Sequence, residues 1–554
     1  MNHQEQQIQS EFSSATPIAK PSEVQISSLI DSMETLAETS WDVIIAGTGL
    51  AQSLLALALS RSGKKILHLD QNPYYGGSEA AFSLEEAQEW MNSVNEHPGQ
   101  SPFEDVKVFT ASSQTVAESS DLVEVPPVVR PKLAASRAYT LSLSPYFLYT
   151  RSQLISILIS SKVYRQLEFM AVGSWWVHSA DHTNSQISDF SDIRDFHRVP
   201  GNREDIFADT HISMKSKRTL MKFLRHISKV EDEETDNGGE NLSMSFGDYL
   251  SSNFSVPQYL HNPLISLSLS QLSSQDTTAN YAVPRVKRHL ASIGALGPGF
   301  GAVISKYGGG SEILQIACRA SAVGGGIYAL NTGIKAFDET SSEAEYPVQV
   351  QLSSEESVRT KFVFGSEWDL AQKQSFPSSK IARSISIVSS NFTFLFPVTV
   401  EGSPVPASAV LMFPGNTLSD SHTPPVYLQV HSSDTGDCPR QQSIIYGSVN
   451  VPGSEGQTLI KSAVDHLLKA EGPQATVLWS ITYNQLGRLT NGGTDSAIQE
   501  YRPHVYSFPP PSLDLTFEDE TIDLVKQAWV KIVGDEVDHD DFMIFDDREG
   551  ASDE

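Results

Sequence analysis

The amino-acid sequence predicts an α/β protein that opens with a Rossmann-type βαβ unit, and three consecutive segments carry this prediction. Residues 41–49 are a short β-branched run that ends in glycines, which is typical of a buried strand entering a tight turn. Residues 50–61 are small and apolar and predict a helix, and residues 64–70 predict a second strand that ends in an acid. A strand, a helix and a strand in this order indicate a parallel sheet.

Composition and charge exclude several classes of protein. Of 554 residues, 39% are hydrophobic and 19% are charged, which excludes fibrous, collagen-like and wholly disordered chains. The length suggests about three to four domains, or one large split domain. The formal net charge of −28 argues against sequence-independent binding of nucleic acid and against constant adhesion to an anionic membrane, and it favours basic partners.

Cysteine content and hydropathy indicate the compartment. The two cysteines, Cys318 and Cys438, cannot build a disulfide framework, so we expect the protein in the reducing cytosol. Residues 1–40 are rich in Gln, Ser and Glu, so we expect a disordered arm without a secretory signal. The longest apolar stretch lies near residues 54–59, far short of the ~20 residues that span a bilayer.

The rest of the chain alternates regular segments with polar connections. Residues 98–132 lack a period, so we expect an insertion or a long loop there. Leu154, Ile157 and Leu158 recur at helical spacing and predict an amphipathic helix over residues 152–167. The remaining expectations are strands at 171–178 and from 324, a basic helix at 213–229, helices at 246–253, 257–270, 285–293, 311–321 and 521–533, and strands alternating with polar loops over 348–481.

The glycine turn after the first strand occupies the position of a dinucleotide fingerprint. Gly47 would make the turn, Gly49 would let backbone amides approach a pyrophosphate, and Asp70 follows about twenty residues later. The third fingerprint position, which needs a small residue for close packing of helix and strand, is Gln52. From these residues alone, a nucleotide site and an inherited scaffold without a nucleotide both stay open.

The segment that follows the second strand identifies a family. Residues 72–77, AsnProTyrTyrGlyGly, come directly after the acid, and together with the glycine turn they resemble the Rab GDP-dissociation inhibitor and Rab escort protein superfamily. Extra segments near 98–132 and 180–195, an acidic C-terminal extension and a strand at 477–484 favour the escort branch. The resemblance continues at residues 146–155, 163–169, 307–310, 323–331 and 518–528.

This resemblance implies a flavin-oxidoreductase-like fold, in which a large domain with the Rossmann unit carries an inserted, smaller, mainly helical domain. No flavin and no other cofactor is expected, because Gln52 replaces the packing glycine and residues 505–511 lack the Gly-Asp pair of flavin enzymes. The implied organisation is an arm at 1–40, the large domain at 41–145 and 301–534, the small domain at about 146–300, and an acidic tail at 535–554.

The resemblance also implies a function. A Rab escort protein binds GDP-loaded Rab GTPases, presents them to the geranylgeranyltransferase type II heterodimer, shelters the geranylgeranyl lipid and delivers the product in transient contact with a membrane. The chemistry takes place on the transferase, so the chain is expected to be a non-catalytic accessory component. Two alternatives stay open: a Rab GDP-dissociation inhibitor that recycles prenylated Rab, and a flavin-dependent oxidoreductase.

Four residues are candidates for the Rab-binding platform by resemblance. The aromatic pair Tyr74 and Tyr75 lies in the tyrosine–glycine motif, Arg285 matches by its spacing to Gly297, and Tyr307 precedes a glycine-rich turn. Tyrosine is a common interface anchor. Each has a plainer interpretation as a packed turn aromatic, a surface arginine or an ordinary turn residue.

Five apolar residues are candidates for the prenyl site, because burial of a wholly apolar lipid is a large driving force. They lie on the two predicted amphipathic helices, and simple core packing is the open alternative; a nucleic-acid face on the basic helix is disfavoured by the acidic charge. The candidates are Leu154, Leu158, Phe223, Leu224 and Ile227.

His289 lies where escort proteins carry the aromatic residue that anchors the transferase, so it is either an aromatic-like substitute or a solvated residue, and Leu290 is the alternative anchor. No catalytic constellation and no metal site is expected. Cys318 lies in a predicted helix without an adjacent base, and the acids after His539 are interpreted as a solvated tail.

Overall fold

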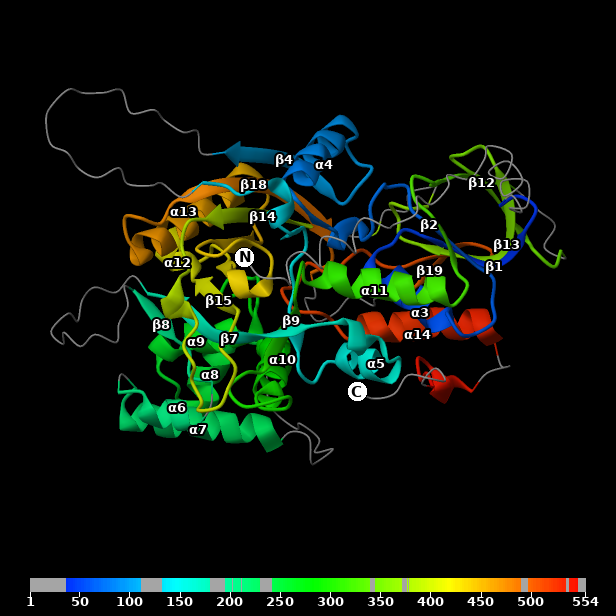
Figure 1. Ribbon diagram of the computed structural model, residues 1–554. Coiled ribbons are helices and arrows are strands. Elements are labelled where there is room, and N and C mark those ends of the chain that lie inside the picture. The colour runs from blue at the N-terminus through cyan, green and yellow to red at the C-terminus, as the bar shows by residue number, and fades with distance from the viewer. Residues whose placement is uncertain are drawn as a thin grey trace, which may run out of the picture.

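The computed structural model describes the chain apart from its two ends and a set of short internal gaps (Figure 1). The described residues are 36–110, 132–179, 195–201, 203–210, 212–229, 242–338, 344–370, 376, 378–489, 497–534 and 538–546. The expected arm at 1–40 therefore lies mostly outside the described residues, as does almost all of the extra segment at 180–195.

The first sheet contains the predicted βαβ unit, which is confirmed. Strands β1 and β2 are parallel, with Ile44 opposite Leu67, and helix α3 connects them. The parallel neighbours β10 and β13 extend the sheet on either side, and β11, β12 and β19 add antiparallel edges. Its elements are β1 (Ser40–Ala46), α3 (Leu50–Leu59), β2 (Ile66–Leu69), β10 (Ile327–Ala329), β11 (Ile334–Asp338), β12 (Val348–Leu352), β13 (Ser357–Gly365), β19 (Gln499–Arg502) and β20 (Val505–Ser507).

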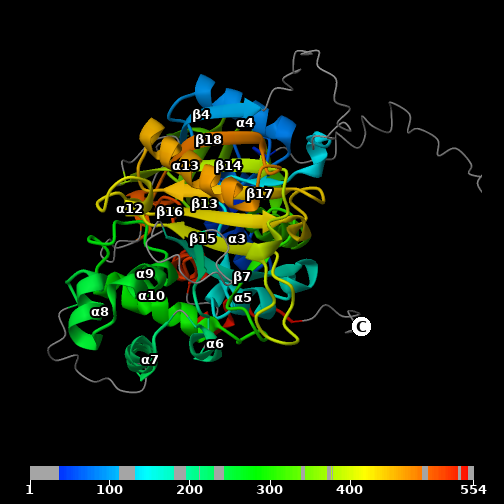
Figure 2. The ribbon, with the colours of Figure 1, turned by 90° about the vertical axis from the view of Figure 1, so that its left-hand side faces the viewer.

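The second sheet is larger and mostly antiparallel, in the order β4-β18-β14-β17-β16-β15-β7-β9-β6, with β8 beside β7. Helix α13 covers one face, where its apolar stripe packs on β14, β16 and β17 (Figure 2). The elements are β4 (Phe103–Thr110), β6 (Leu148–Tyr149), β7 (Phe169–His178), β8 (Phe196–Arg198), β9 (Ala302–Ser305), β14 (Ser379–Val388), β15 (Ser408–Phe413), β16 (Val426–Ser432), β17 (Ser443–Val449), α13 (Gly453–Glu471) and β18 (Val477–Gly487).

The remaining helices form two groups. One packs against α3 beneath the first sheet, and the other lies below the second sheet, at the opposite end of the molecule in Figure 1. The first group is α5 (Gln153–Ser160), α11 (Gly310–Val323) and α14 (Glu520–Val533); the second is α6 (Arg203–Ala208), α7 (Met214–Lys229), α8 (Phe246–Phe254), α9 (His261–Ser268) and α10 (Ala279–Ser292). Smaller elements are β3 (Ala81–Phe82), α4 (Leu84–Glu96), β5 (Leu141–Ser142) and α12 (Gly415–Leu418).

Several expectations about single elements were wrong. The helix expected over 152–167 ends at Ser160, because Lys162 adopts a left-handed conformation (φ 63°) and a short 3-10 helix follows. The segment 98–132 contains strand β4, which pairs with β18, and its remaining part from 111 to 131 lies outside the described residues. The stretch 348–481 holds the long helix α13 as well as strands.

The first part of the acidic tail packs against the protein instead of lying in solvent. Met543 and Phe545 are buried, and the ring of Phe542 lies 5.5 Å from that of Trp529. The guanidinium of Arg61 donates a hydrogen bond to the carbonyl of Asp546. The acids Asp540 and Asp541 are exposed, as the interpretation of a solvated tail predicts, whereas the buried apolar residues of 538–546 pack against the protein.

The range 146–300 is not built of helices alone. Strands β6 and β7 belong to the second sheet, and α5 packs with α3, so residues 146–179 are joined to segments from both ends of the chain. The helices of the second group lie between residues 203 and 292. Among the described residues, no helix has both the length and the apolar character to cross a membrane.

Candidate functional site

Both carboxylate oxygens of Asp70, the acid that follows β2, accept hydrogen bonds from neighbouring groups of the same chain. One carboxylate oxygen of Asp70 accepts hydrogen bonds from the backbone amide and the hydroxyl of Thr48. The other accepts from the backbone and side-chain amides of Asn72, at 2.8 and 2.9 Å. In dinucleotide-binding folds this acid receives the ribose hydroxyls. Here it fixes the glycine turn to the segment that carries Tyr74 and Tyr75.

A second carboxylate lies directly on the glycine turn. A Cβ added at Gly47 (φ 84°) would be 2.2 Å from an oxygen of Asp369, so that side chain covers the turn. Ser366 donates to Asp369 from its amide and its hydroxyl, and the side-chain amide of Gln52 donates at 3.3 Å. Burial, together with the charge of Asp70, raises the pKa of Asp369 to about 7.

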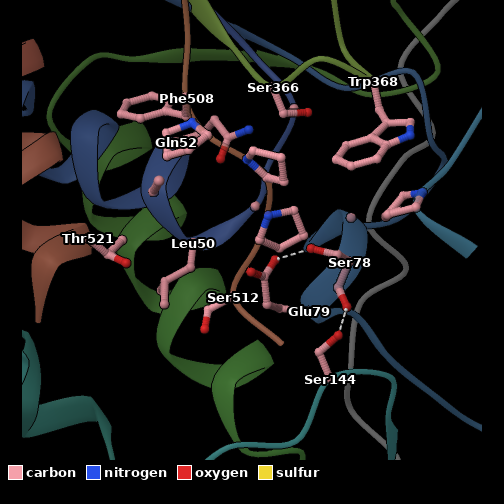
Figure 3. A pocket seen from close by; sticks show the side chains of 18 of the residues that line it. Leu50, Gln52, Ser78, Glu79, Ser144, Ser366, Trp368, Phe508, Ser512 and Thr521 are labelled. Carbon is pink, nitrogen blue, oxygen red and sulfur yellow. Dashed lines mark hydrogen bonds between the residues drawn. The ribbon is translucent and has the colours of Figure 1, made fainter. Parts of the chain in front are cut away.

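A third carboxylate lies at the N-terminus of α3. The amide of Leu50, the first residue of α3, hydrogen-bonds to Glu79, and burial raises the pKa of Glu79 to about 7. Gln52 and Glu79 line a pocket beside the glycine turn. Figure 3 shows these two side chains on different sides of the pocket, with Phe508 and Ser512 of the C-terminal segment beside them. A helix N-terminus at this position is where a pyrophosphate would bind.

These residues do not fit a dinucleotide. The side chains of Asp369 and Glu79 occupy space at the glycine turn and at the N-terminus of α3, where the phosphates would bind, and the pocket has a volume of about 140 Å³, below the roughly 300–1,000 Å³ of ordinary ligand pockets. Pro509, Pro510 and Pro511 of the segment that lacks the Gly-Asp pair line its wall. Of the two interpretations of the glycine turn, the structure favours the scaffold.

Because the pKa of Asp369 is raised, we expect the free energy of unfolding to depend on pH. A carboxyl that titrates near 7 when folded and near its ordinary value when unfolded favours the folded state at low pH. That contribution is lost as the pH rises from about 4 to about 7. Asp369→Asn removes it, so the variant should gain stability over the unsubstituted protein across this window and keep a constant advantage above it. Urea unfolding at pH 4.5, 6.0 and 7.5 measures the difference.

The exposed residue Asp465 provides the control, since it lies on the surface of α13 with half of its side chain in solvent. Asp465→Asn should show no such pH-dependent gain. A constant difference between Asp369→Asn and the unsubstituted protein at all three pH values would contradict the assignment.

The aromatic residues of the expected platform lie on two adjoining segments. Tyr74 is half-buried with its ring edge-on to Phe82 at 4.8 Å, and the half-buried ring of Tyr75 lies 6.2 Å from that of Tyr328. Tyr307, at the turn before α11, is 50% exposed. The two segments meet directly, because a Cβ added at Gly308 would lie 3.1 Å from the Cβ of Ala81.

Arg285 does not lie on this surface, and the expectation of an exposed arginine was wrong. Its guanidinium is 2.7 Å from Asp514 and 3.4 Å from Glu518, and it lies over the ring of Tyr281 at 4.3 Å. These carboxylates raise its pKa above the ordinary value. The side chain is only 20% exposed, so it joins α10 to the C-terminal segment.

An apolar cavity of about 590 Å³ lies among the helices of the second group. Leu224 and Ile227 of α7 line it, whereas Phe223 is fully buried between Phe246 and Phe254. Side chains from α9 and α10 also line it, among them Leu264, Leu267 and Leu290, and residues between 199 and 212 form a further part of the wall.

The prenyl candidates on the two predicted helices are not brought together. Leu154 and Leu158 of α5 are buried in the cluster around α3, while Leu224 and Ile227 belong to the cluster below the second sheet. Leu154 and Leu158 are thus core residues in this structure, and they do not line the apolar cavity.

His289 is a core residue too, which contradicts its interpretation as a solvated residue. It is 4% exposed, with its ring centre 4.6 Å from that of Trp175 and 5.7 Å from that of Tyr149. Burial lowers the pKa of His289 to about 4, so the imidazole is neutral. Leu290, the alternative candidate, is half-buried in the cavity wall.

The two cysteines are buried, and burial raises the pKa of Cys318 to about 11 and that of Cys438 to about 12. Both thiols are therefore protonated at neutral pH and unsuited to nucleophilic chemistry. In the part of the chain that the structure describes, no group of three or more potential ligands is placed to hold a metal ion.

Comparison with protein families identifies the family that most of the chain matches. Residues 37–106 and 112–480 match the family described as GDP dissociation inhibitor. The chain belongs to the GDP dissociation inhibitor family. Within this family it is similar to the "Rab proteins geranylgeranyltransferase component A" of Saccharomyces cerevisiae, at 27% identity over 76% of this chain and 64% of that protein. It is similar to the protein of the same name from Candida albicans, at 27% identity over 74% and 59%.

The chain thus spans about three fifths of the length of these two fungal relatives. A plant relative, "Rab escort protein 1" of Arabidopsis thaliana, is 22% identical over 90% of this chain and 94% of its own length. These names confirm the resemblance to the superfamily of Rab escort proteins and GDP dissociation inhibitors, with the escort branch favoured.

Solved structures confirm the fold class. A Rab GDI from Plasmodium falciparum superposes with a TM-score of 0.62 at 18% identity, over 90% of this chain and 99% of that one. An oxidoreductase from Methanosarcina mazei superposes with a TM-score of 0.51 at 12% identity, over 88% and 99%. The family member described here therefore has the α/β architecture that its first seventy residues predict.

Two kinds of site residue were missed by sequence reasoning. Asp369 and Glu79, which close the glycine turn, lie outside the strands and α-helices, in segments without any periodic or motif signal for this position. Leu264 and Leu267 belong to a segment that was expected to be helical, and its apolar spacing would have supported a place in the cavity wall.

Proposed function

We propose that this chain is a Rab escort protein. It binds GDP-loaded Rab GTPases, presents them to the geranylgeranyltransferase type II heterodimer and delivers the prenylated product to a membrane. It works from the cytoplasm with transient membrane contact, and as an accessory component it carries out no chemistry of its own. The apolar cavity between α7, α9 and α10, in a member of this family, is the observation that carries the proposal.

The chemistry of the cavity suits a branched hydrocarbon chain. Its lining is dominated by leucine, isoleucine and methionine side chains, and each methylene moved from water into such a space contributes about 0.8 kcal/mol. Such a ligand needs no hydrogen-bond partner inside. Two cationic side chains of the lining, Arg225 and Lys287, lie on the helices that face each other across it.

The absence of a place for a flavin supports the accessory role. The carboxylates of Asp369 and Glu79 fill the positions that a dinucleotide phosphate would need. Transferase binding stays a prediction that now rests on Leu290, because His289 is buried.

The test of the proposal is geranylgeranylation of a Rab by the purified transferase, with and without this chain. An escort protein stimulates the reaction and forms a ternary complex with unprenylated Rab·GDP and the transferase. If the chain leaves prenylation unchanged but extracts prenylated Rab from membranes, it is a GDP-dissociation inhibitor. If it retains a stoichiometric flavin after gel filtration, the oxidoreductase interpretation is correct.

Truncation of Tyr75 should weaken Rab·GDP binding by roughly tenfold or more. Loss of an interface anchor typically costs about 2 kcal/mol, and a tenfold change corresponds to about 1.4 kcal/mol. Because the ring is half-buried, Tyr75→Ala should lower the melting temperature only slightly. A Rab·GDP titration and a melting curve measure both effects.

Tyr164→Ala is the matched control, since Tyr164 is 40% exposed on a different surface segment. It should leave binding and melting unchanged. If Tyr75→Ala melts many degrees lower, Tyr75 is a packing residue of the turn and not an anchor.

A further inference from the structure

The turn that presents Tyr307 is held in an unusual backbone conformation. Tyr307 has a φ of 64°, in the left-handed region that bulky residues rarely adopt. Such a residue is strained and persists only when its surroundings enforce it. Half of the side chain is nevertheless exposed to solvent. The conformation therefore directs a ring outward at a cost to the fold.

A short segment after β16, residues 433–437, enforces this conformation. The amide of Tyr307 donates to the carbonyl of Thr435 at 2.9 Å, and the amide of Gly308 donates to a carboxylate oxygen of Asp437 at 2.9 Å. The ring of Tyr307 lies against Gly436, where a Cβ would be 2.5 Å from two ring carbons. Backbone and ring are thus held by three consecutive residues.

The side chain and the backbone of Asp437 are held by further hydrogen bonds. Its second carboxylate oxygen accepts a hydrogen bond from Nδ1 of His431 at 2.8 Å, and the two side chains are 2% and 4% exposed. The carbonyl of Asp437 accepts from the amide of Thr140, and the ring of His431 lies 4.9 Å from that of Tyr446. The two carboxylate oxygens therefore have separate roles, since one orients Asp437 on His431 and the other holds Gly308.

A role in packing alone does not account for this arrangement. The exposed ring of Tyr307 adds little to the core, and a glycine at 307 would adopt the same backbone without strain. The turn that carries Tyr307 adjoins β3, the strand that follows the segment of Tyr74 and Tyr75, because a Cβ at Gly308 would lie 3.1 Å from the Cβ of Ala81.

We infer that Asp437, oriented by His431, is a positioning residue that holds the ring of Tyr307 outward for contact with the Rab partner. This inference rests on the proposed function. Asp437 is buried and does not touch the partner, so its effect on binding passes through Tyr307.

The test is a double-mutant cycle in a Rab·GDP titration. Tyr307→Gly should weaken binding about tenfold, with an unchanged or raised melting temperature, because glycine relieves the strain. Asp437→Ala should weaken binding by a similar factor. Combined with Tyr307→Gly, it should cause no further loss, because residues that act through one another are not additive. Asp437→Asn, which keeps an oxygen for the amide of Gly308, should recover most of the binding.

Gly436→Ala tests the same inference while keeping both side chains of the buried pair, because the added methyl group meets two carbons of the Tyr307 ring. Since Gly436 has a φ of 80°, the Tyr307→Gly background also measures the backbone strain of this substitution. Its effect on binding should also vanish in the Tyr307→Gly background, even if Asp437→Ala fails to fold. Full additivity in both cycles, or unchanged binding by Tyr307→Gly, would overturn the inference while leaving the proposed function intact. If the unsubstituted chain binds no Rab·GDP, the proposed function fails, and the inference fails with it.

Discussion

Replacing Arg285 by alanine is expected to lower the free energy of unfolding by about 3–5 kcal/mol at neutral pH, the cost of breaking a buried ion pair from one side. Asp514, its partner at 2.7 Å, is 4% exposed and would lose its cationic partner in a place from which water is largely excluded. Glu518 would lose its contact with Arg285 but keep the one with Arg488 at 3.1 Å. The loss should therefore arise mainly from Asp514.

Arg288 on the same helix provides the control. It contacts Asp519 at 3.1 Å, but both side chains are more exposed, at 29% and 23%. Ion pairs of that kind contribute about 0–1 kcal/mol. Arg288→Ala should thus shift the urea midpoint far less than Arg285→Ala.

The double variant Arg285→Ala/Asp514→Ala separates the ion pair from the loss of side-chain volume. It should be less destabilised than the sum of the two single variants, because the second substitution removes the unpaired charge. Simple additivity would mean that the pair contributes nothing. An unchanged stability of Arg285→Ala, together with weaker Rab binding, would restore Arg285 to the platform.

The contrast between Arg285 and the βαβ unit explains which parts of the structure the sequence could predict. The strand, turn and helix of residues 40–59 are specified by residues close together in the chain, so the local sequence pattern predicts them. The partners of Arg285 lie more than two hundred residues away, on a segment that only the folded chain brings near. Spacing along α10 predicts a helix face, but not what covers it.

The candidate site shows the same division. The glycine turn and its acid were located from the motif, whereas Asp369, which closes the turn, comes from a loop 317 residues beyond Gln52. Leu158 and Leu224 both lie on apolar faces of helices, and an apolar face alone does not distinguish a core from a cavity. That distinction depends on which helices meet, which is a property of the tertiary structure.

Leu224 offers the most direct test of the proposal that the apolar cavity binds lipid. Its side chain is half-buried and lines the cavity, so Leu224→Glu places a carboxylate against any bound hydrocarbon without removing a fully buried core residue. The substitution removes apolar contacts and forces a charge to lose its hydration when lipid enters, which costs several kcal/mol. Since about 2.8 kcal/mol corresponds to a hundredfold change, we expect the affinity for a geranylgeranylated peptide to fall at least a hundredfold.

Fluorescence titration with a labelled geranylgeranylated peptide measures this loss of affinity. Two control variants show whether the loss arises at the cavity. Met214→Glu lies on the same helix but is 62% exposed and absent from the cavity lining, so it should bind the peptide normally. Leu158→Val, in the core around α3, should lower stability somewhat and leave lipid affinity unchanged, because α5 does not reach the cavity. Binding of unprenylated Rab·GDP should be unaffected by Leu224→Glu, since the proposed platform residues Tyr75 and Tyr307 lie on other segments of the chain. If Leu224→Glu folds and binds the peptide as tightly as the unsubstituted protein, the lipid does not bind in this cavity. If Leu158→Val weakens lipid binding instead, the lipid binds near the cluster around α3.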